Sequence, residues 1–112
     1  MKPPILSRKL TLETPERVPD GAGGFAIDWQ PLGVLWAEIS PGTGRERALH
    51  QLPRSLVPLR IFVRAAPVES PSRPIAGQRF REGSRVYNIN AVTEKDRSGR
   101  FLLCHADEEV AT

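Results

Sequence analysis

The stretch that decides the fold reads Val57-Pro58-Leu59-Arg60-Ile61-Phe62-Val63-Arg64. Every second residue from Val57 to Val63 is aliphatic, and two arginines stand on the alternate positions. Alternation with a period of two is typical of a strand with one buried face. Pro58 cannot donate a backbone hydrogen bond, so we expect it near the start of the strand or on an edge.

The same alternation recurs on both sides of this strand, in residues 9–13, 25–30, 34–39, 79–81, 85–89 and 101–106. Eleven prolines and nine glycines break the chain between these runs, which favours short strands over long helices. We therefore predict an all-β fold. Residues 1–112 would form one small barrel or sandwich of six or seven short antiparallel strands with long inserted loops.

Three segments are predicted to lie outside the strands. Residues 1–7 are expected to be a flexible N-terminus, residues 40–56 a long loop, and residues 65–78 a proline-rich link. A short helical turn is possible around residues 45–52, and Pro53 would end it. Residues 15–24 are interpreted as a long turn, and Pro31 and Gly33 as a break between two strands.

The strand alternation also predicts the core. We expect one buried cluster made of Leu10, Leu12, Leu35, Ile39, Leu59, Ile61, Val63, Tyr87, Ile89 and Leu103. Trp36 and Phe62 fall on the opposite, otherwise polar faces of their strands. Exposed aromatic side chains of this kind often anchor interfaces.

Composition argues against a membrane protein. No apolar run approaches the roughly 20 residues of a membrane span, and the first residues lack the apolar region of a signal peptide. The single cysteine, Cys104, cannot form an internal disulfide and indicates a reducing compartment. The formal net charge of +3 is mildly basic and does not by itself indicate nucleic acid.

No motif predicts catalysis, a metal or an organic cofactor. Cys104 and His105 would point to opposite faces of a strand, so they cannot share a metal, and Cys104 is interpreted as a small core residue. The glycine-rich run of residues 20–24 is followed by a predicted strand where a phosphate loop has a helix, and it contains no Lys-Ser or Lys-Thr pair. We interpret it as a hairpin turn whose glycines supply positive φ angles.

Taken in order, the pieces of residues 10–109 resemble the phage head–tail joining proteins, also called head-closure or stopper proteins and head–tail adaptors. The resemblance rests on Asp20-Gly21-Ala22-Gly23-Gly24-Phe25, Trp29, Val34-Leu35-Trp36-Ala37-Glu38-Ile39, Gly44-Arg45-Glu46, Arg60 to Arg64, Arg79, Gly83, Tyr87, Ile89, Asp96, Gly99-Arg100, Leu102 and Glu108-Glu109. It implies a β-barrel subunit of a ring beneath the portal of a filled capsid. Such a ring continues the DNA channel, retains the packaged genome and docks the tail.

The resemblance also implies partners and a location. The chain would assemble with itself in a ring matching the portal symmetry, with a portal or adaptor protein above and a tail protein below. Packaged double-stranded DNA would fill the lumen without sequence readout, and no membrane would be involved. The protein would be made in the bacterial cytoplasm and reside at the head–tail junction of a phage, prophage or gene transfer agent particle.

Two surfaces follow as hypotheses. Residues 40–56 would line the DNA channel through Arg45, Arg47, His50 and Arg54, since the net charge of this segment is positive. The contacts with neighbouring subunits or partners would involve Trp36, Glu46, Phe62, Arg60 and Arg64. Two alternatives stay open: a tail terminator or minor tail protein of the same particle, and a stand-alone nucleic-acid-binding barrel of the OB type.

Overall fold

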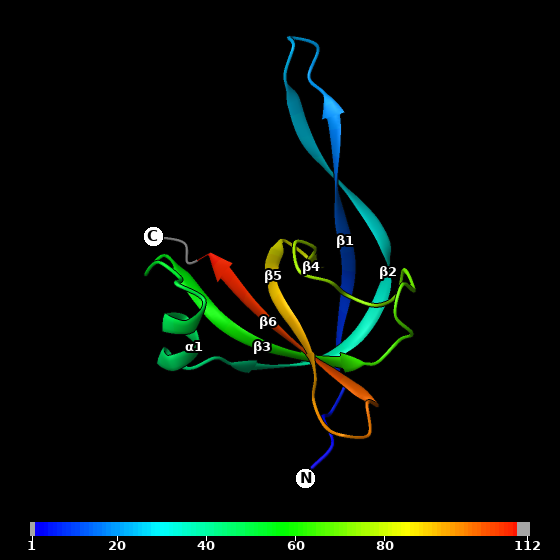
Figure 1. The fold of residues 1–112 in the computed structure, drawn as a ribbon, viewed down its shortest axis with the longest axis vertical. Helices are drawn as coiled ribbons and strands as arrows, with labels where there is room; N and C mark the ends of the chain where they lie inside the picture. The colour runs from blue at the N-terminus through cyan, green and yellow to red at the C-terminus, as the bar shows by residue number, and fades with distance from the viewer. Residues whose placement is uncertain (1, 110–112) are drawn as a thin grey trace.

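The computed structural model describes residues 2–109 and forms a closed antiparallel β-barrel (Figure 1). Six strands and one short helix occur in this range, in the order β1 (Arg8–Pro19), β2 (Phe25–Pro41), α1 (Gly44–Leu49), β3 (Leu56–Arg64), β4 (Arg79–Glu82), β5 (Arg85–Glu94) and β6 (Phe101–Glu109). The strand order around the barrel is β1-β2-β3-β6-β5-β4, and β4 pairs with β1 to close it. The predicted all-β barrel is confirmed.

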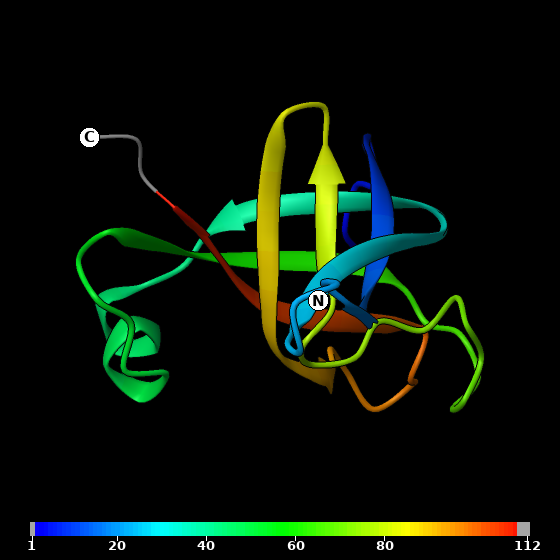
Figure 2. The same ribbon diagram turned by 90° about the horizontal axis from the view of Figure 1, so that it is seen from above.

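Closure lets each strand turn one face inward, and Figure 2 shows β4 and β5 running across β2 and β3 to enclose the interior. The core of buried apolar residues consists of Leu10, Leu12, Ala37, Ile61, Val63, Phe80, Tyr87, Ile89, Leu102, Cys104 and Ala106. Leu35, Ile39 and Leu59 pack against it while partly buried. The buried position of Cys104 confirms its interpretation as a core residue.

The predicted burial of Leu103 is wrong. On β6 the inward set is Leu102, Cys104 and Ala106, whereas Leu103 and His105 are only half-buried. The register explains this outcome, because Cys104 lies opposite the core residue Ile61 on β3. Both alternating sets contain a leucine, so the alternation alone did not decide which face of β6 turns inward.

The first two strands are longer than predicted, and they form a hairpin that projects beyond the barrel (Figure 1). Residues 15–19 belong to β1, so the turn is confined to residues 20–24, and β2 continues through Pro31 and Gly33. The pairing of β1 with β2 shifts between Leu12 and Glu13, and this bulge accommodates Pro31 and Gly33 within one strand. Gly33 has a φ of 150°, a backbone conformation that favours glycine. The projection contributes to the 53 Å length of the molecule.

The segment predicted as a long loop, residues 40–56, contains helix α1, which begins at Gly44 and overlaps the predicted helical turn of residues 45–52. Pro58 lies third in β3 and so near its start, as expected. A tight turn at Gly83, with a φ of 61°, joins β4 to β5. Within residues 2–109, no helix is long and apolar enough to cross a membrane.

Residues 2–7 precede β1, and Met1 of the predicted flexible terminus lies outside the described residues. The amide of Ile5 donates to the Glu38 carboxylate at 3.0 Å. In the link of residues 65–78, Arg73 donates to the carbonyl of Ala66 at 2.9 Å. Both segments therefore make defined contacts.

Candidate functional site

Helix α1 begins at a sequence-encoded cap and stands on the side of the barrel formed by β3 and β6. The Thr43 hydroxyl accepts a hydrogen bond from the amide of Glu46 at 3.1 Å, as an N-cap residue should. The preceding chain passes close to β3, with the amide of Gly42 donating to the carbonyl of Pro58 at 2.9 Å. A Cβ atom at Gly42 would come within 2.8 Å of Pro58 Cβ, so glycine is required there.

The four residues predicted to line a DNA channel fall into two pairs. Arg45 and Arg54 are exposed. Arg47 is half-buried and donates to the carbonyl of Pro53 at 2.8 Å, which closes the loop after the helix. His50 is half-buried, and its ring centroid lies 5.3 Å from that of His105 on β6. Two of the four side chains are therefore free to meet a partner, and the other two make contacts within the chain.

Glu46 and Arg60, both assigned to an interface from the sequence, lie close together within the chain. Arg60 Nε is 3.7 Å from Glu46 Oε1, a distance that allows an ion pair but no hydrogen bond. Burial lowers the pKa of His105; Glu46 partly offsets this, and His50 and Arg60 lower it further. The neutral form of His105 is therefore favoured beside His50 and Arg60. This cluster connects α1 to β3 and β6.

Trp36 and Arg64 lie together on the outer surface. They line a cavity of about 240 Å³ with Leu6, Val34 and Leu35. The side chain of Trp36 is 54% exposed, and Arg64 also lies over the ring of Phe101 at 5.7 Å. Phe62 is half-buried, pairs across strands with Glu38, and has the ammonium of Lys95 5.7 Å from its ring centroid. Of the predicted interface residues, Trp36 and Arg64 therefore form one apolar groove with a basic edge.

The hairpin is a surface that the sequence did not indicate. Beyond the barrel, Phe25 is 60% exposed and Ile27 is 53% exposed, although both lie in a paired strand. Arg17 stacks over the Phe25 ring at 4.2 Å. At the tip, Asp20 accepts hydrogen bonds from the amides of Ala22 and Gly24, and the positive φ angles of Gly21 and Gly23 confirm the predicted turn.

A contact at the base of the hairpin fixes its direction. Glu13 is buried, and its carboxylate accepts from Arg79 Nε at 2.7 Å and from Arg81 Nε at 3.2 Å. The Arg79 guanidinium in turn lies 4.1 Å from the ring centroid of Trp29 on β2. Burial raises the pKa of Glu13, but the two arginines outweigh it and hold this pKa below its ordinary value. The projection is thereby braced against β4.

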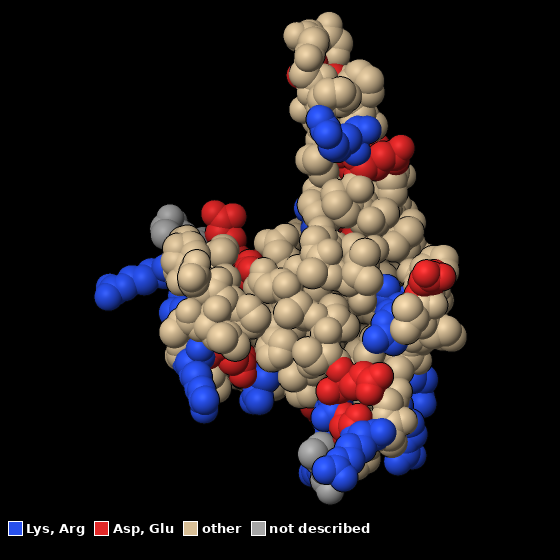
Figure 3. Space-filling model, in the orientation of Figure 1, with Lys and Arg blue, Asp and Glu red and all other residues tan. Residues whose placement is uncertain are grey.

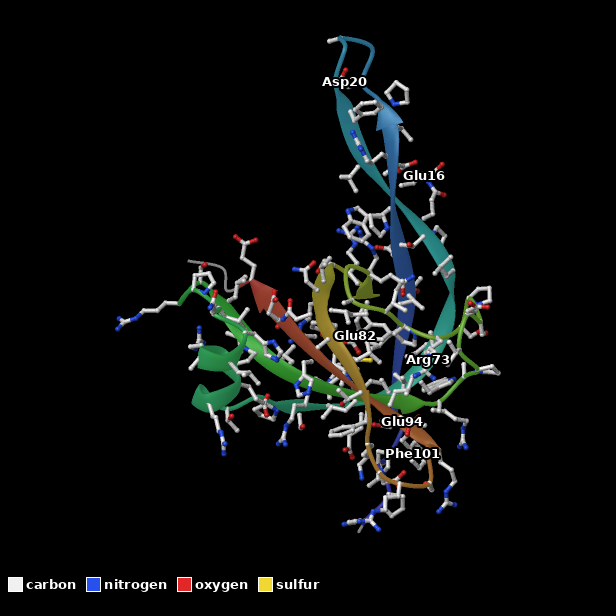
Figure 4. All side chains as sticks on the ribbon, in the orientation of Figure 1. Glu16, Asp20, Arg73, Glu82, Glu94 and Phe101 are labelled. Atoms are coloured by element: carbon white, nitrogen blue, oxygen red, sulfur yellow. The ribbon has the colours of Figure 1, made fainter. Side chains whose placement is uncertain are left out.

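A second carboxylate, that of Glu82 at the C-terminal end of β4, joins neighbouring strands. Glu82 accepts from Arg8 Nε at 2.8 Å and from the Tyr87 hydroxyl at 2.8 Å. These partners, Arg8 foremost, lower its pKa to about 2 against the opposing effect of burial. Burial first, and then the bond to Glu82, raise the pKa of Tyr87 to about 12. Figure 4 places Glu82 in the middle of the molecule, where it has a structural role.

None of these clusters has the composition of a metal centre. Among residues 2–109, no group of three or more His, Cys, Asp or Glu side chains could hold a metal ion. Cys104 and His105 do lie on opposite faces of β6, since one is in the core and the other faces His50. Burial raises the pKa of the Cys104 thiol to about 12, which makes it a poor nucleophile.

Comparison with known proteins identifies the family. The model of the phage head completion protein family matches residues 1–109. Among solved structures, a chain in the virion of a native gene transfer agent particle is 50% identical, with a TM-score of 0.80 over 98% of this chain and 100% of that chain. The solution structure of protein SF1141 from Shigella flexneri 2a shares the fold at 20% identity, with a TM-score of 0.70 over the whole of both chains. No curated protein matches.

The fold, the surfaces and these similarities define a structural component of a tailed-phage type of particle. The chain belongs to the phage head completion protein family, and its role is that of a head–tail connector that completes the head. The resemblance seen in the sequence is thus confirmed. Its partners belong to the head and the tail of the particle.

Proposed function

We propose that this chain forms a ring beneath the portal or adaptor protein of a DNA-filled head, where it continues the DNA channel, retains the genome and docks the tail. Membership of the head completion family supports this position, and the 50% identity to a gene transfer agent virion chain supports a particle of that kind. The ring would match the portal symmetry. It would act by assembly alone, without catalysis or a cofactor.

The observation that carries the proposal is the basic excursion of residues 40–56. It leaves the barrel after β2, forms α1 and returns at β3, with Arg45 and Arg54 exposed. Figure 3 shows basic side chains standing out from the side of the molecule where Figure 1 draws α1. Three arginines against one glutamate give it a net charge of +2 with its histidine neutral. We place this segment in the ring lumen, where one copy per subunit would present guanidinium groups to the phosphates. Such contacts need no sequence readout.

We assign different roles to the four predicted channel residues. Arg47 is bonded within the segment and His50 lies against His105 of β6, so these two would shape and hold the segment, while Arg45 and Arg54 would contact phosphates. Glu46 and Arg60 would position α1 through their mutual contact; their role in a subunit interface stays a prediction. Trp36, Phe62 and Arg64 remain the proposed contact surface for neighbouring proteins.

The test is the double variant Arg45→Ala/Arg54→Ala in assembled particles. Both side chains are exposed, so the barrel should fold normally. Filled heads should form and then lose DNA more readily than the unmodified particles. In unmodified heads the loss should grow with salt, since ions screen charges over roughly 8 Å at physiological ionic strength. In the double variant the loss should already be high at low salt and depend less on salt, because two of the screened contacts are gone. DNA retained in purified heads is measured over a salt series.

Arg97→Ala/Arg100→Ala is the matched control. It removes two exposed arginines from the loop between β5 and β6 and should leave DNA retention unchanged. Equal leakage from both double variants would refute the lumen placement. A folded Arg45→Ala/Arg54→Ala subunit that fails to join the particle would instead identify residues 40–56 as an assembly interface.

A further inference from the structure

We propose that the hairpin of residues 14–30 docks into the groove of the next copy of this chain, the groove being the cavity lined by Leu6, Val34, Leu35, Trp36 and Arg64. This inference rests on the proposed ring and specifies how its subunits join. The inference is based on two exposed surfaces of the same molecule and on their opposite charges.

The hairpin has the properties of an inserted element. Its aromatic and aliphatic side chains at Phe25 and Ile27 are more than half exposed and lie beyond the barrel, where no other strand of the described chain covers them. The Glu13–Arg79–Trp29 contacts hold its base in one direction. A projection that is ordered before it binds loses little conformational entropy on binding.

The groove has the properties of a receptor for such an element. Its volume of about 240 Å³ equals the liquid share of roughly eight waters, which gives room for a large apolar side chain. Its own hairpin cannot fill it. The N-terminal segment before β1, which includes Leu6, lies at the lower end of Figure 1, whereas the hairpin tip lies at the upper end.

Charge favours a second copy as the occupant. The hairpin carries Glu16, Asp20 and Asp28 against the single Arg17, a net charge of −2. Figure 4 places Glu16 and Asp20 along its projecting part. The groove includes Arg64, and Lys9 lies opposite Trp36 in the β1–β2 register. The acid on the same face, Glu38, is engaged by the amide of Ile5.

The arrangement also predicts the type of assembly. Since the hairpin and the groove are different surfaces, a subunit that inserts its hairpin leaves its own groove open to the following subunit. Head-to-tail contacts of this type generate a closed ring when the rotation between subunits closes. A symmetric dimer contact would end after two copies.

Chemical cross-linking in assembled particles tests the inference. Ser7→Cys beside the groove and Ala26→Cys on the hairpin are combined in one chain; both positions are exposed. Ala26 pairs with Val18, eleven residues along β1 from Ser7, so the two thiols of one chain stand roughly 36 Å apart. A bismaleimide with a much shorter spacer can join them only between copies. The buried Cys104 should not react.

The expected result is a ladder of dimers and higher oligomers from the double variant and monomers from each single variant. The control pair Ser55→Cys/Ala26→Cys, with Ser55 exposed near α1, should give monomers. A second pair, Lys9→Cys/Ala22→Cys, repeats the test at neighbouring positions in case one variant does not fold. A ladder from either groove pair supports the inference.

Three results would overturn it: no ladder from both groove pairs, a ladder from the Ser55 pair alone, or cross-links from Ala22 or Ala26 only to a different head or tail protein. In each case the subunit is still recovered with DNA-filled heads, so the connector function stands. Absence of the unmodified protein from filled heads would instead refute the proposed function itself.

Discussion

Replacing Glu13 with glutamine should loosen the base of the hairpin and destabilise the barrel. Glu13 lies on β1 where that strand pairs with both neighbours, opposite Pro31 of β2 and Arg79 of β4. Its carboxylate binds the guanidinium groups of Arg79 and Arg81. Glutamine keeps the shape but removes the charge, and it leaves both arginines without their anion.

The magnitude follows from the burial of the three side chains. Removal of one partner from a fully buried ion pair costs about 3–5 kcal/mol. Here the side chains of Glu13 and Arg79 are 10% and 15% exposed, but that of Arg81 is 40% exposed, so water screens part of the effect. We expect a loss of about 1–3 kcal/mol from a total stability of roughly 5–15 kcal/mol. The melting temperature should fall by about 4–12 °C.

The loss should depend on pH with a defined sign. The folded-state pKa of Glu13 lies below the ordinary value of 4.5. A carboxyl group of this kind contributes its stability above the unfolded-state pKa and loses it as the pH falls through the folded-state pKa. The difference in unfolding free energy between the unmodified protein and Glu13→Gln should therefore be full at neutral pH and shrink below about pH 4.5.

Urea denaturation at neutral pH and near pH 3 measures both quantities, with the linear dependence on denaturant giving the free energy. Glu16→Gln is the matched control: it makes the same chemical change three residues further along β1, at an exposed position. This control should lie within about 0.5 kcal/mol of the unmodified protein. An equal loss from the two variants, or a Glu13→Gln effect that stays constant down to acidic pH, would refute the charge-pair reasoning.

Two further predictions concern the core. Ile61→Ala should cost about 2–5 kcal/mol, whereas Ile27→Ala, the same deletion at a half-exposed site, should cost less than about 1 kcal/mol by urea denaturation; equal costs would contradict the core assignment. Cys104 should resist alkylation of the native protein near pH 8 and react fully in denaturant, because burial raises its thiol pKa to about 12. Rapid alkylation of the native protein, followed by mass spectrometry, would show that the thiol is accessible.

The fold was predictable because successive residues of a barrel strand face the core and the solvent alternately. The alternation of Leu59, Ile61 and Val63 contains that information in the local sequence. The length of the hairpin was not accessible in the same way. Pro31 and Gly33 have strong turn preferences, and only pairing with β1 and the bulge opposite Leu12 and Glu13 keep them in one strand.

The candidate surfaces were only half predictable for a related reason. Trp36 stood out because it is a large aromatic residue on the polar face of a strand, and it is indeed exposed. The position of His50 against His105 joins residues 55 positions apart, and no local pattern encodes such a contact. The basic charge of residues 40–56 was visible in the sequence, but the division between exposed and internally bonded arginines depends on tertiary contacts.

Both projections from the barrel are fixed by charged side chains at their bases, and this has a consequence for assembly. Glu13 with Arg79 braces the hairpin, and Glu46 of α1 with Arg60 of β3 joins the helix to the barrel. Loops that were free in the subunit would have to be ordered when it joined a particle, at a cost of about 0.5–1.5 kcal/mol for each immobilised side chain. Here that conformational entropy is already lost when the subunit folds. Under the proposed docking, the free energy gained by burying Phe25 and Ile27 would therefore go into association.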